Sequence, residues 1–369
     1  MTRTLRIHSF RDIGRKGGRH SMATTPWFWI LFNLFVIGML ALDLGVFNRK
    51  AHRIGVKEAA IWSVVWISLA LLFDLGLYLF EGSEIAMQFL GGYLLEKSLS
   101  VDNIFVFVMI FTYFATPAEY QHRVLYWGIL TALVLRGAMI LTGAALISRF
   151  DFLIGIFGLL LIVTAIRMMR SGNEEGDLSN NVVVRLTQRF FRVTEGYRGQ
   201  RFTVVEQGKR WITPLLVVLL VVETSDVIFA VDSIPAVFGI TTDPFIVYTS
   251  NVFAILGLRS LYFLLAGVVD KFHYLKLGLS LVLGFVGVKM VLETVTGYTM
   301  EHPIHVPIQW SLLVIAIVLG VSVGASLAFP RRELEPALVE ATEPTAEELL
   351  AAAEELRRSR QELADLQGD

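Results

Sequence analysis

Three acidic residues lie inside a stretch of the chain that is otherwise apolar enough to sit in lipid. The segment from Leu215 to Gly239 contains Glu223, Asp226 and Asp232. On insertion scales, a carboxylate near the centre of a bilayer costs about 2.5–3.5 kcal/mol. A purely structural role does not account for three carboxylates at that cost. We therefore interpret the three carboxylates as a site for a cation.

A second apolar segment adds Glu96 and Asp102, beside further hydroxyl and amide groups. An all-oxygen set of hard donors suits Mn²⁺, Mg²⁺ or Ca²⁺ better than zinc or copper. The predicted metal ligands are Asp102, Glu223, Asp226, Asp232 and Glu96, and the predicted supporting residues are Lys97, Ser100, Asn103, Arg136, Thr224, Ser225, Ser233, Asn251 and Arg259.

The spacing of these acids conflicts with an unbroken helix, on which residues six apart are rotated by roughly 240°. Glu96 and Asp102 would then lie on different faces, and so would Asp226 and Asp232. Because Pro235 has no backbone N–H, we expect the second helix to open near it. The first segment lacks such a proline. An alternative for Glu96 is therefore that it lines the access path on the outer side and is not a metal ligand.

The ionisable residues expected inside the membrane have a surplus of negative charge. The five acids face three bases, Lys97, Arg136 and Arg259, which leaves a net charge of −2. One divalent cation would neutralise it, and protonation of two carboxylates would do so equally well, because desolvation favours the neutral form. We expect metal and protons to compete. The alternative is that the acids only join helices, but polar contacts between membrane helices contribute only about 0.6 kcal/mol on average.

Composition places these residues in a polytopic membrane protein. Hydrophobic residues make up 54% of the 369 residues and charged residues 18%, against roughly 25% charged in soluble domains. The chain has no cysteine, which excludes disulfides, thiolate metal sites and cysteine nucleophiles. The net charge of −1 gives no sign of nucleic-acid binding.

Nine apolar stretches are long enough to cross a hydrocarbon core, which needs about 20 helical residues. They are 27–47, 58–80, 85–114, 123–147, 151–169, 212–240, 244–268, 274–293 and 306–329. The fold class predicted is an all-α polytopic membrane protein. Arg167 and Lys289 lie near the ends of their spans, where we expect them to extend toward water.

Basic residues in the connections predict the orientation, because Lys and Arg resist translocation. Loops 48–57, 170–211 and 270–276 are basic and are expected in the cytoplasm, and 81–84, 148–150, 241–243 and 294–305, nearly free of Lys and Arg, are expected outside. The N-terminus is then external and the C-terminus cytoplasmic. Six basic residues within 1–26 contradict this unless translation starts at Met22.

Two three-span units repeat at a shift of 122–124 residues. Asp102-Asn-Ile-Phe105 matches Asp226-Val-Ile-Phe229, and Leu135-Arg136 matches Leu258-Arg259. Because three is odd, the second unit enters the membrane in the opposite direction, so we expect inverted repeats with a site near the midplane between them. The predicted division is an arm (1–26), two leading spans (27–80), the first repeat (85–169), a cytoplasmic loop (170–211) interpreted as a solvated linker, the second repeat (212–293), a last span (306–329) and a charged cytoplasmic tail (330–369).

Both acidic motifs are long enough to carry a family resemblance. Glu96-Lys-Ser-Leu-Ser-Val-Asp-Asn-Ile-Phe-Val-Phe107, Val222-Glu-Thr-Ser-Asp-Val-Ile-Phe-Ala-Val-Asp-Ser-Ile-Pro-Ala-Val237 and the segment Asp43–Lys50 resemble the TerC family, which includes the Alx-type proteins. The resemblance covers residues from about Trp27 to about Phe329.

The resemblance implies an inner-membrane protein of a family named for tellurium resistance, now associated with manganese export, and grouped with other three-plus-three cation exporters. By this resemblance, the family's intramembrane acids correspond to the five carboxylates above, and Mn²⁺ is the implied substrate. No permanently bound cofactor is expected, and the expected partners are the lipid bilayer, a divalent cation and, as coupling ion, protons. Oligomeric state stays open. The alternatives are a tellurium-resistance factor and a membrane-protein biogenesis factor without transport activity.

Overall fold

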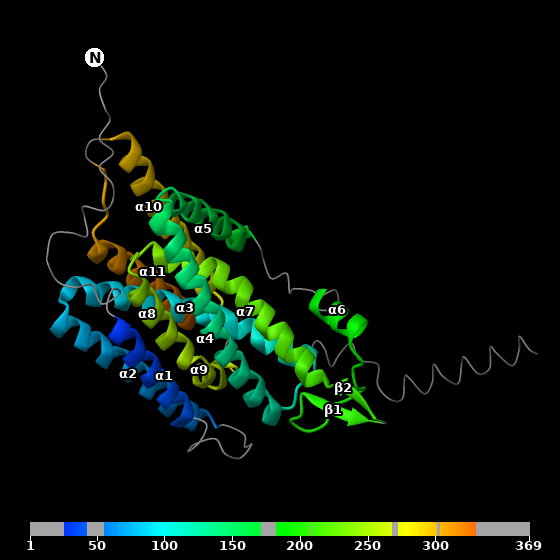
Figure 1. Cartoon of the computed structure of the whole chain (residues 1–369). Coiled ribbons are helices and arrows are strands. Elements are labelled where there is room, and N and C mark those ends of the chain that lie inside the picture. Colours follow the sequence, from blue (N-terminus) through cyan, green and yellow to red (C-terminus); the bar gives the residue numbers. More distant parts are fainter. Residues whose placement is uncertain are drawn as a thin grey trace, which may run out of the picture. The chain divides into compact units, whose positions relative to one another are not determined.

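The computed structural model describes residues 26–42, 55–170, 182–206, 208–267, 272–300 and 303–329. The arm before Pro26, the Asp43–Lys50 motif and the tail from Pro330 lie outside these residues. Residues up to Leu327 form one compact unit, whose helices are labelled in Figure 1. The elements are α1 (Pro26–Leu42), α2 (Val56–Phe80), α3 (Ser83–Tyr113), α4 (Ala118–Arg149), α5 (Leu153–Arg170), α6 (Val182–Phe190), β1 (Thr203–Glu206), β2 (Lys209–Ile212), α7 (Pro214–Phe238), α8 (Pro244–Leu256), α9 (Leu258–Leu265), α10 (Leu275–Thr299) and α11 (Ile308–Ala328).

Six of the described helices are long and apolar enough to cross a membrane, or seven if the bent pair α8 and α9 forms one span. Each of the nine stretches expected from the sequence overlaps a described helix, but the count of nine spans is not confirmed. With 17 residues, α1 is short for a span, and α3 carries four acidic or basic residues. The expected span 244–268 is broken at Gly257, where the chain bends by 41°.

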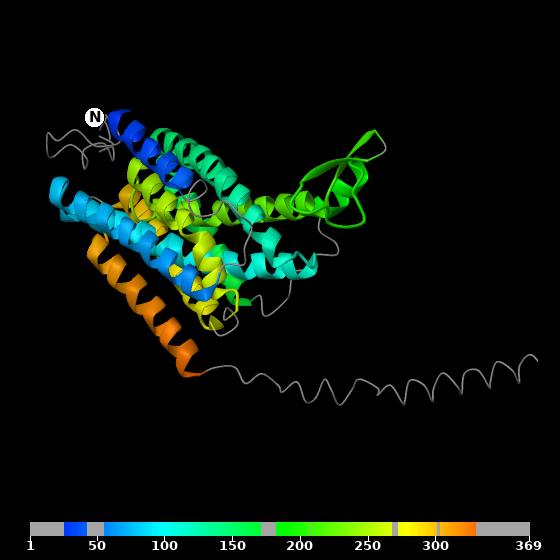
Figure 2. The same cartoon turned by 90° about the horizontal axis from the view of Figure 1, so that it is seen from below.

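The helices pack so that elements distant in sequence are neighbours. Helix α3 packs on α8 and α7, α4 packs on α7 and α8, and α5 packs along α10. Figure 1 shows α5 and α10 side by side, and Figure 2 shows α11, in orange, at the edge of the bundle. One cluster of buried side chains joins α1, α2, α3 and α8 through aromatic rings such as Phe32, Phe89 and Phe253.

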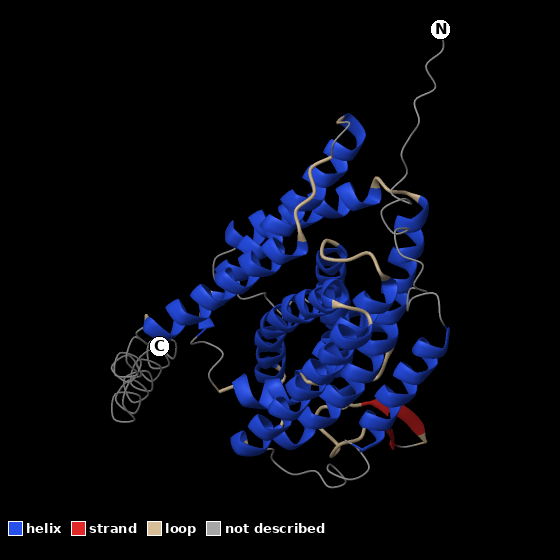
Figure 3. Ribbon diagram, turned by 90° about the vertical axis from the view of Figure 1, so that its left-hand side faces the viewer, coloured by secondary structure: helices blue, strands red, loops and turns tan. Residues whose placement is uncertain are grey.

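A small non-helical region sits between α5 and α7. Strands β1 and β2 form an antiparallel hairpin, drawn in red in Figure 3, and α6 precedes it. The Tyr197 hydroxyl donates to the carbonyl oxygen of Phe114 at 2.8 Å and shares a hydrogen bond with the Thr116 hydroxyl. These bonds connect the region to the loop after α3. The described part of 170–211 is therefore ordered, which the expectation of a solvated linker did not include.

Helices α5 and α10 approach so closely that only glycine fits at their contact. A Cβ atom built on Gly287 would lie 2.7 Å from the carbonyl oxygen of Gly158, and one built on Gly158 would lie 2.8 Å from that of Gly287. Backbone atoms cannot move aside as a flexible side chain can. The two glycines thus set the distance between the helices.

Replacing Gly287 by alanine should push α5 and α10 apart and lower the free energy of unfolding by about 1–3 kcal/mol, the usual cost of overpacking. Thermal unfolding of the purified protein in detergent measures this. The control is Gly320→Ala in α11, because a Cβ there would meet nothing within 4 Å and alanine favours the helix by up to about 1 kcal/mol. Equal melting temperatures for the two variants would contradict the packing described.

Candidate functional site

Arg136, on α4, is the centre of a buried charge cluster that joins both acidic motifs. Its Nη2 donates to Asp226 Oδ1 at 2.9 Å and its Nε to Asp226 Oδ2 at 3.3 Å. Its Nη1 donates to Glu96 Oε1. The three residues are only 2%, 6% and 0% exposed, respectively. The planar guanidinium matches a carboxylate with two parallel bonds, so α4 holds one acid from α3 and one from α7 together.

Neutral groups complete the surroundings of the Arg136 guanidinium. Its Nη1 also lies 3.3 Å from Ser233 Oγ and 3.4 Å from Asn251 Oδ1. The amide of Asn251 donates to the carbonyl oxygen of Val247 at 3.0 Å, which orients its oxygen toward the arginine. Glu96 Oε2 is buried and has no hydrogen-bond partner among the described residues. One carboxylate oxygen of the cluster is therefore still able to accept a bond.

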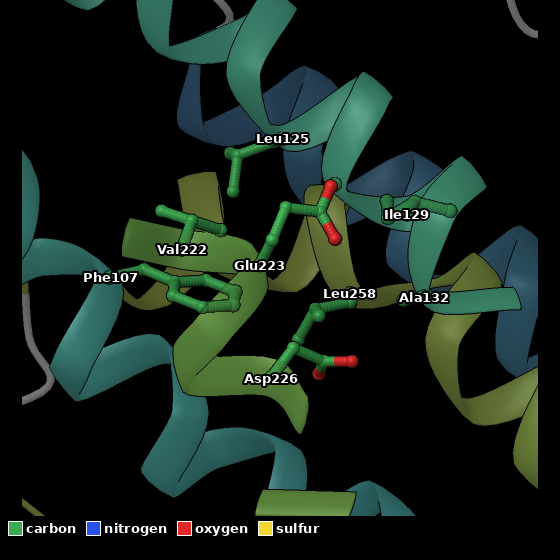
Figure 4. Close-up of a pocket in the computed structure, with 9 residues that line it drawn as sticks. Phe107, Leu125, Ile129, Ala132, Val222, Glu223, Asp226 and Leu258 are labelled. Carbon is green, nitrogen blue, oxygen red and sulfur yellow. The ribbon is translucent and has the colours of Figure 1, made fainter. Parts of the chain in front are cut away.

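Glu223 lies one helical turn before Asp226 on α7, and both border a cavity between α7 and α4. Figure 4 shows the two carboxyl groups among apolar side chains that include Phe107, Leu125 and Val222. The cavity offers about 10 Å³ to a water molecule, room for about one. Neither Glu223 oxygen has a hydrogen-bond partner of good geometry in the described structure, although the Thr131 hydroxyl lies near enough to interact. A compact cation could lie here between two carboxylates.

The other two predicted ligands point elsewhere. Asp102 lies near Lys276 at the start of α10. Asp232 accepts a hydrogen bond from the Thr164 hydroxyl at 3.0 Å and has Arg167 nearby. Among the described residues, no group of three or more acidic or histidine side chains is placed to hold a metal ion. In this conformation the five predicted carboxylates do not converge.

The continuity of α7 explains this divergence. The helix runs through Pro235 to Phe238, so the break expected there is absent, and that expectation was wrong. Without it, Asp226 and Asp232 keep the roughly 240° separation of residues six apart on a helix. Asp226 faces α4, whereas Asp232 faces α5.

Several predicted supporting residues bond within their own helix. The hydroxyls of Ser100, Thr224 and Ser225 donate to the backbone carbonyl four residues earlier. Asn103 is buried in α3. Arg259, the repeat counterpart of Arg136, lies 3.3 Å from the His122 ring. Of the supporting set, Arg136, Ser233 and Asn251 are the residues that the structure brings to the acids.

Two lysines, Lys289, which is buried, and Lys97, which is half-buried, cap the ends of other helices. Lys97 Nζ donates to the carbonyl oxygen of Ala254 at 3.3 Å, one turn before the bend, and a Cβ on Gly257 would come within 2.7 Å of that nitrogen. Lys289 Nζ donates to the Gly239 carbonyl at 3.3 Å and is 7% exposed, so the expectation that it extends toward water was wrong. Arg167 is exposed, as expected. A glycine inside the apolar run 244–268 was the available signal for the bend, and the sequence reading missed it.

Comparisons with known proteins show the family of this chain. Residues 81–334 match the model of the integral membrane protein TerC family. The chain belongs to the TerC family. It is 53% identical over 303 residues to the Myxococcus xanthus membrane protein STKORF319, covering 82% of this chain and 92% of that protein. It is 47% identical over 300 residues to the Escherichia coli K12 protein named "Putative membrane-bound redox modulator Alx", covering 79% of this chain and 91% of that one. No solved structure matches the chain significantly.

Arg136→Gln should leave Glu96 and Asp226 buried without compensation, and we expect the free energy of unfolding to fall by about 3–5 kcal/mol. Unfolding in detergent followed by tryptophan fluorescence measures the loss. Adding Glu96→Gln and Asp226→Asn to the same chain should restore much of it, because the uncompensated charges are then gone. The matched control is Arg198→Gln, which breaks the exposed pair with Glu206 and should cost less than about 1 kcal/mol. If the triple variant is as unstable as Arg136→Gln alone, the uncompensated charges are not the cause of the destabilisation.

Proposed function

We propose that this TerC-family protein exports a hard divalent cation, Mn²⁺, across the membrane through the carboxylates of α3 and α7. The observation that carries the proposal is the pair Glu223 and Asp226, whose carboxyl groups share a cavity between α7 and α4. With Glu96 they place three acids against one base, Arg136; Glu96, Asp226 and Arg136 are buried and Glu223 is half-buried. The surplus of two negative charges equals the charge of one such cation, and oxygen donors suit Mn²⁺.

In this proposal the guanidinium of Arg136 and the metal ion take turns at the same carboxylates. Arg136 compensates Glu96 and Asp226 when no metal is present. A divalent cation entering beside Glu223 would repel the guanidinium and recruit Asp226. Binding would then shift the chain toward a second conformation, as expected of a transporter that alternates between two states. Asp102 and Asp232 would serve the path to and from the site.

The packing of the helices supports inverted repeats, α3–α5 and α7–α10, as the frame of this transport. A twofold relation between the units would exchange α3 with α7, α4 with α8 and α9, and α5 with α10. Contacts of α3 with α8 and of α4 with α7 are the exchanged pair that such a relation requires, and α5 with α10 is a self-paired contact. We propose nine spans in the inner membrane, with the N-terminus outside and the C-terminus in the cytoplasm, as the basic loops favour.

The alternatives are less well supported by the buried charge. A tellurite site should present surplus positive charge to an oxyanion, and this cluster has the opposite sign. The name of the Escherichia coli relative refers to redox modulation, but this chain has no cysteine, so a thiol could not carry that role here. A biogenesis factor without transport would have no need of Glu223, which makes this residue the most informative to change.

Glu223→Gln should abolish export while leaving the Arg136 cluster in place, because Glu223 makes no ion pair there. Cells expressing the variant should retain more Mn than cells expressing wild type, measured by elemental analysis at equal protein levels. Asp226→Asn should have the same effect, with some loss of stability. Glu195→Gln, which changes an exposed acid in the loop before the hairpin, is the control. If Glu223→Gln and Asp226→Asn lower Mn as well as wild type does, the carboxylates are not the pathway.

Competition between metal and protons predicts coupled transport. In proteoliposomes of the full chain, an imposed pH gradient should accelerate Mn²⁺ flux against the proton flow, because protonation of the carboxylates and metal binding exclude each other. The measurement is Mn²⁺ movement with and without the gradient at fixed membrane potential. Flux that ignores the gradient would remove the coupling and leave the cation site standing.

A further inference from the structure

The region between α5 and α7 carries much positive charge for its size. Residues 182–212, here called the basic segment, contain seven arginines and lysines and two acids, a net charge of +5. Arg189, Arg201, Lys209 and Arg210 are exposed. Of the acids, Glu206 is already paired with Arg198 at 2.8 Å. Most of the positive charge is therefore available to a partner.

Large apolar side chains are exposed on the same segment. Leu186 on α6 is 46% exposed, Phe191 just after α6 is 58% exposed, and Val205 on β1 is 68% exposed. The opposite side of α6 is buried through Val184 and Thr187. Apolar side chains among arginines are typical of helices that lie at the surface of a membrane.

The position of α6 brings this surface to the edge of the bilayer. Val184 belongs to the same buried cluster as Leu215 and Val218 in the first turns of α7, and Figure 1 shows α6 beside that end of the helix. The 25 residues of α7 are about 37 Å long at 1.5 Å per residue, more than the roughly 30 Å of hydrocarbon. The excess length is enough for the first turns of α7, and α6 with them, to reach the level of the lipid headgroups. The Tyr197 hydrogen bonds hold the segment there.

We propose that the basic segment binds the anionic phospholipid headgroups of the leaflet on its own side, with Leu186 and Phe191 entering the boundary with the acyl chains. Basic residues are attracted to an anionic membrane surface. Each one strengthens binding to that surface by a factor of about five. The arginines would fix the segment to the lipid phosphates. This inference does not depend on which ion the protein transports.

The chain has no cysteine, so one introduced thiol can be labelled without background. We would label Leu186→Cys with an environment-sensitive fluorophore and place the full-length protein in nanodiscs of phosphatidylcholine, alone or mixed with phosphatidylglycerol. We expect a shift to an apolar environment, and quenching by lipids with brominated chains, only when phosphatidylglycerol is present. Arg189→Gln with Arg210→Gln should lower the docked fraction markedly, by about fivefold for each charge removed, whereas the two Arg→Lys replacements should retain it.

Two controls make the result specific. A label at Val134→Cys on α4, which is 68% exposed and mid-span, should respond equally in both kinds of disc. Arg149→Gln, at the far end of α4, should leave the Leu186 signal unchanged. Equal Leu186 signals in the two discs, or a signal unaffected by the glutamine replacements, would overturn the proposal. So would protection of the label that appears only after an acidic protein is added.

Discussion

The buried guanidinium of Arg136 is the constraint on which the centre of this protein depends. It is closed to solvent and has two carboxylates and two neutral oxygens around it. Removing any one partner leaves a charge in a medium that cannot solvate it. The cluster therefore constrains how α3, α4, α7 and α8 approach one another, because each of these helices supplies at least one of its members.

A neighbour of this cluster satisfies the backbone at the bend between α8 and α9. A bend frees backbone carbonyls that water would normally satisfy, and in lipid they need another partner. Lys97, next to Glu96 on α3, donates to one of them, and Gly257 leaves the room that the ammonium needs. Asn251, one turn earlier, faces Arg136. The segment of α3 that carries Glu96 and the residues just before the bend are thus in direct contact.

The sequence predicted the parts of this structure that follow from local rules. Apolar length located each long helix, and the cost of a charge in lipid drew attention to Glu96 and Asp226, which the structure joins through Arg136. It failed where a contact between distant segments decides the outcome. The pattern suggested an opening at Pro235, but α7 stays continuous because its last turns are buried on all sides.

The partners of individual ions were equally hard to predict. Arg136 and Arg259 occupy equivalent places in the repeat, yet one joins two carboxylates and the other lies beside His122. Lys289, near the end of its span in sequence, turns inward to the carbonyl of Gly239. The partner of a buried basic side chain depends on which acceptor group the tertiary fold places beside it. Helical periodicity in the sequence does not predict that.

The contact between Gly158 and Gly287 limits how the protein can move. Where two helices meet through side chains, they slide past each other by exchanging rotamers. Where they meet through bare peptide groups, no rotamer exists to exchange. A closer approach of α5 and α10 at this point would therefore require the two backbones themselves to move.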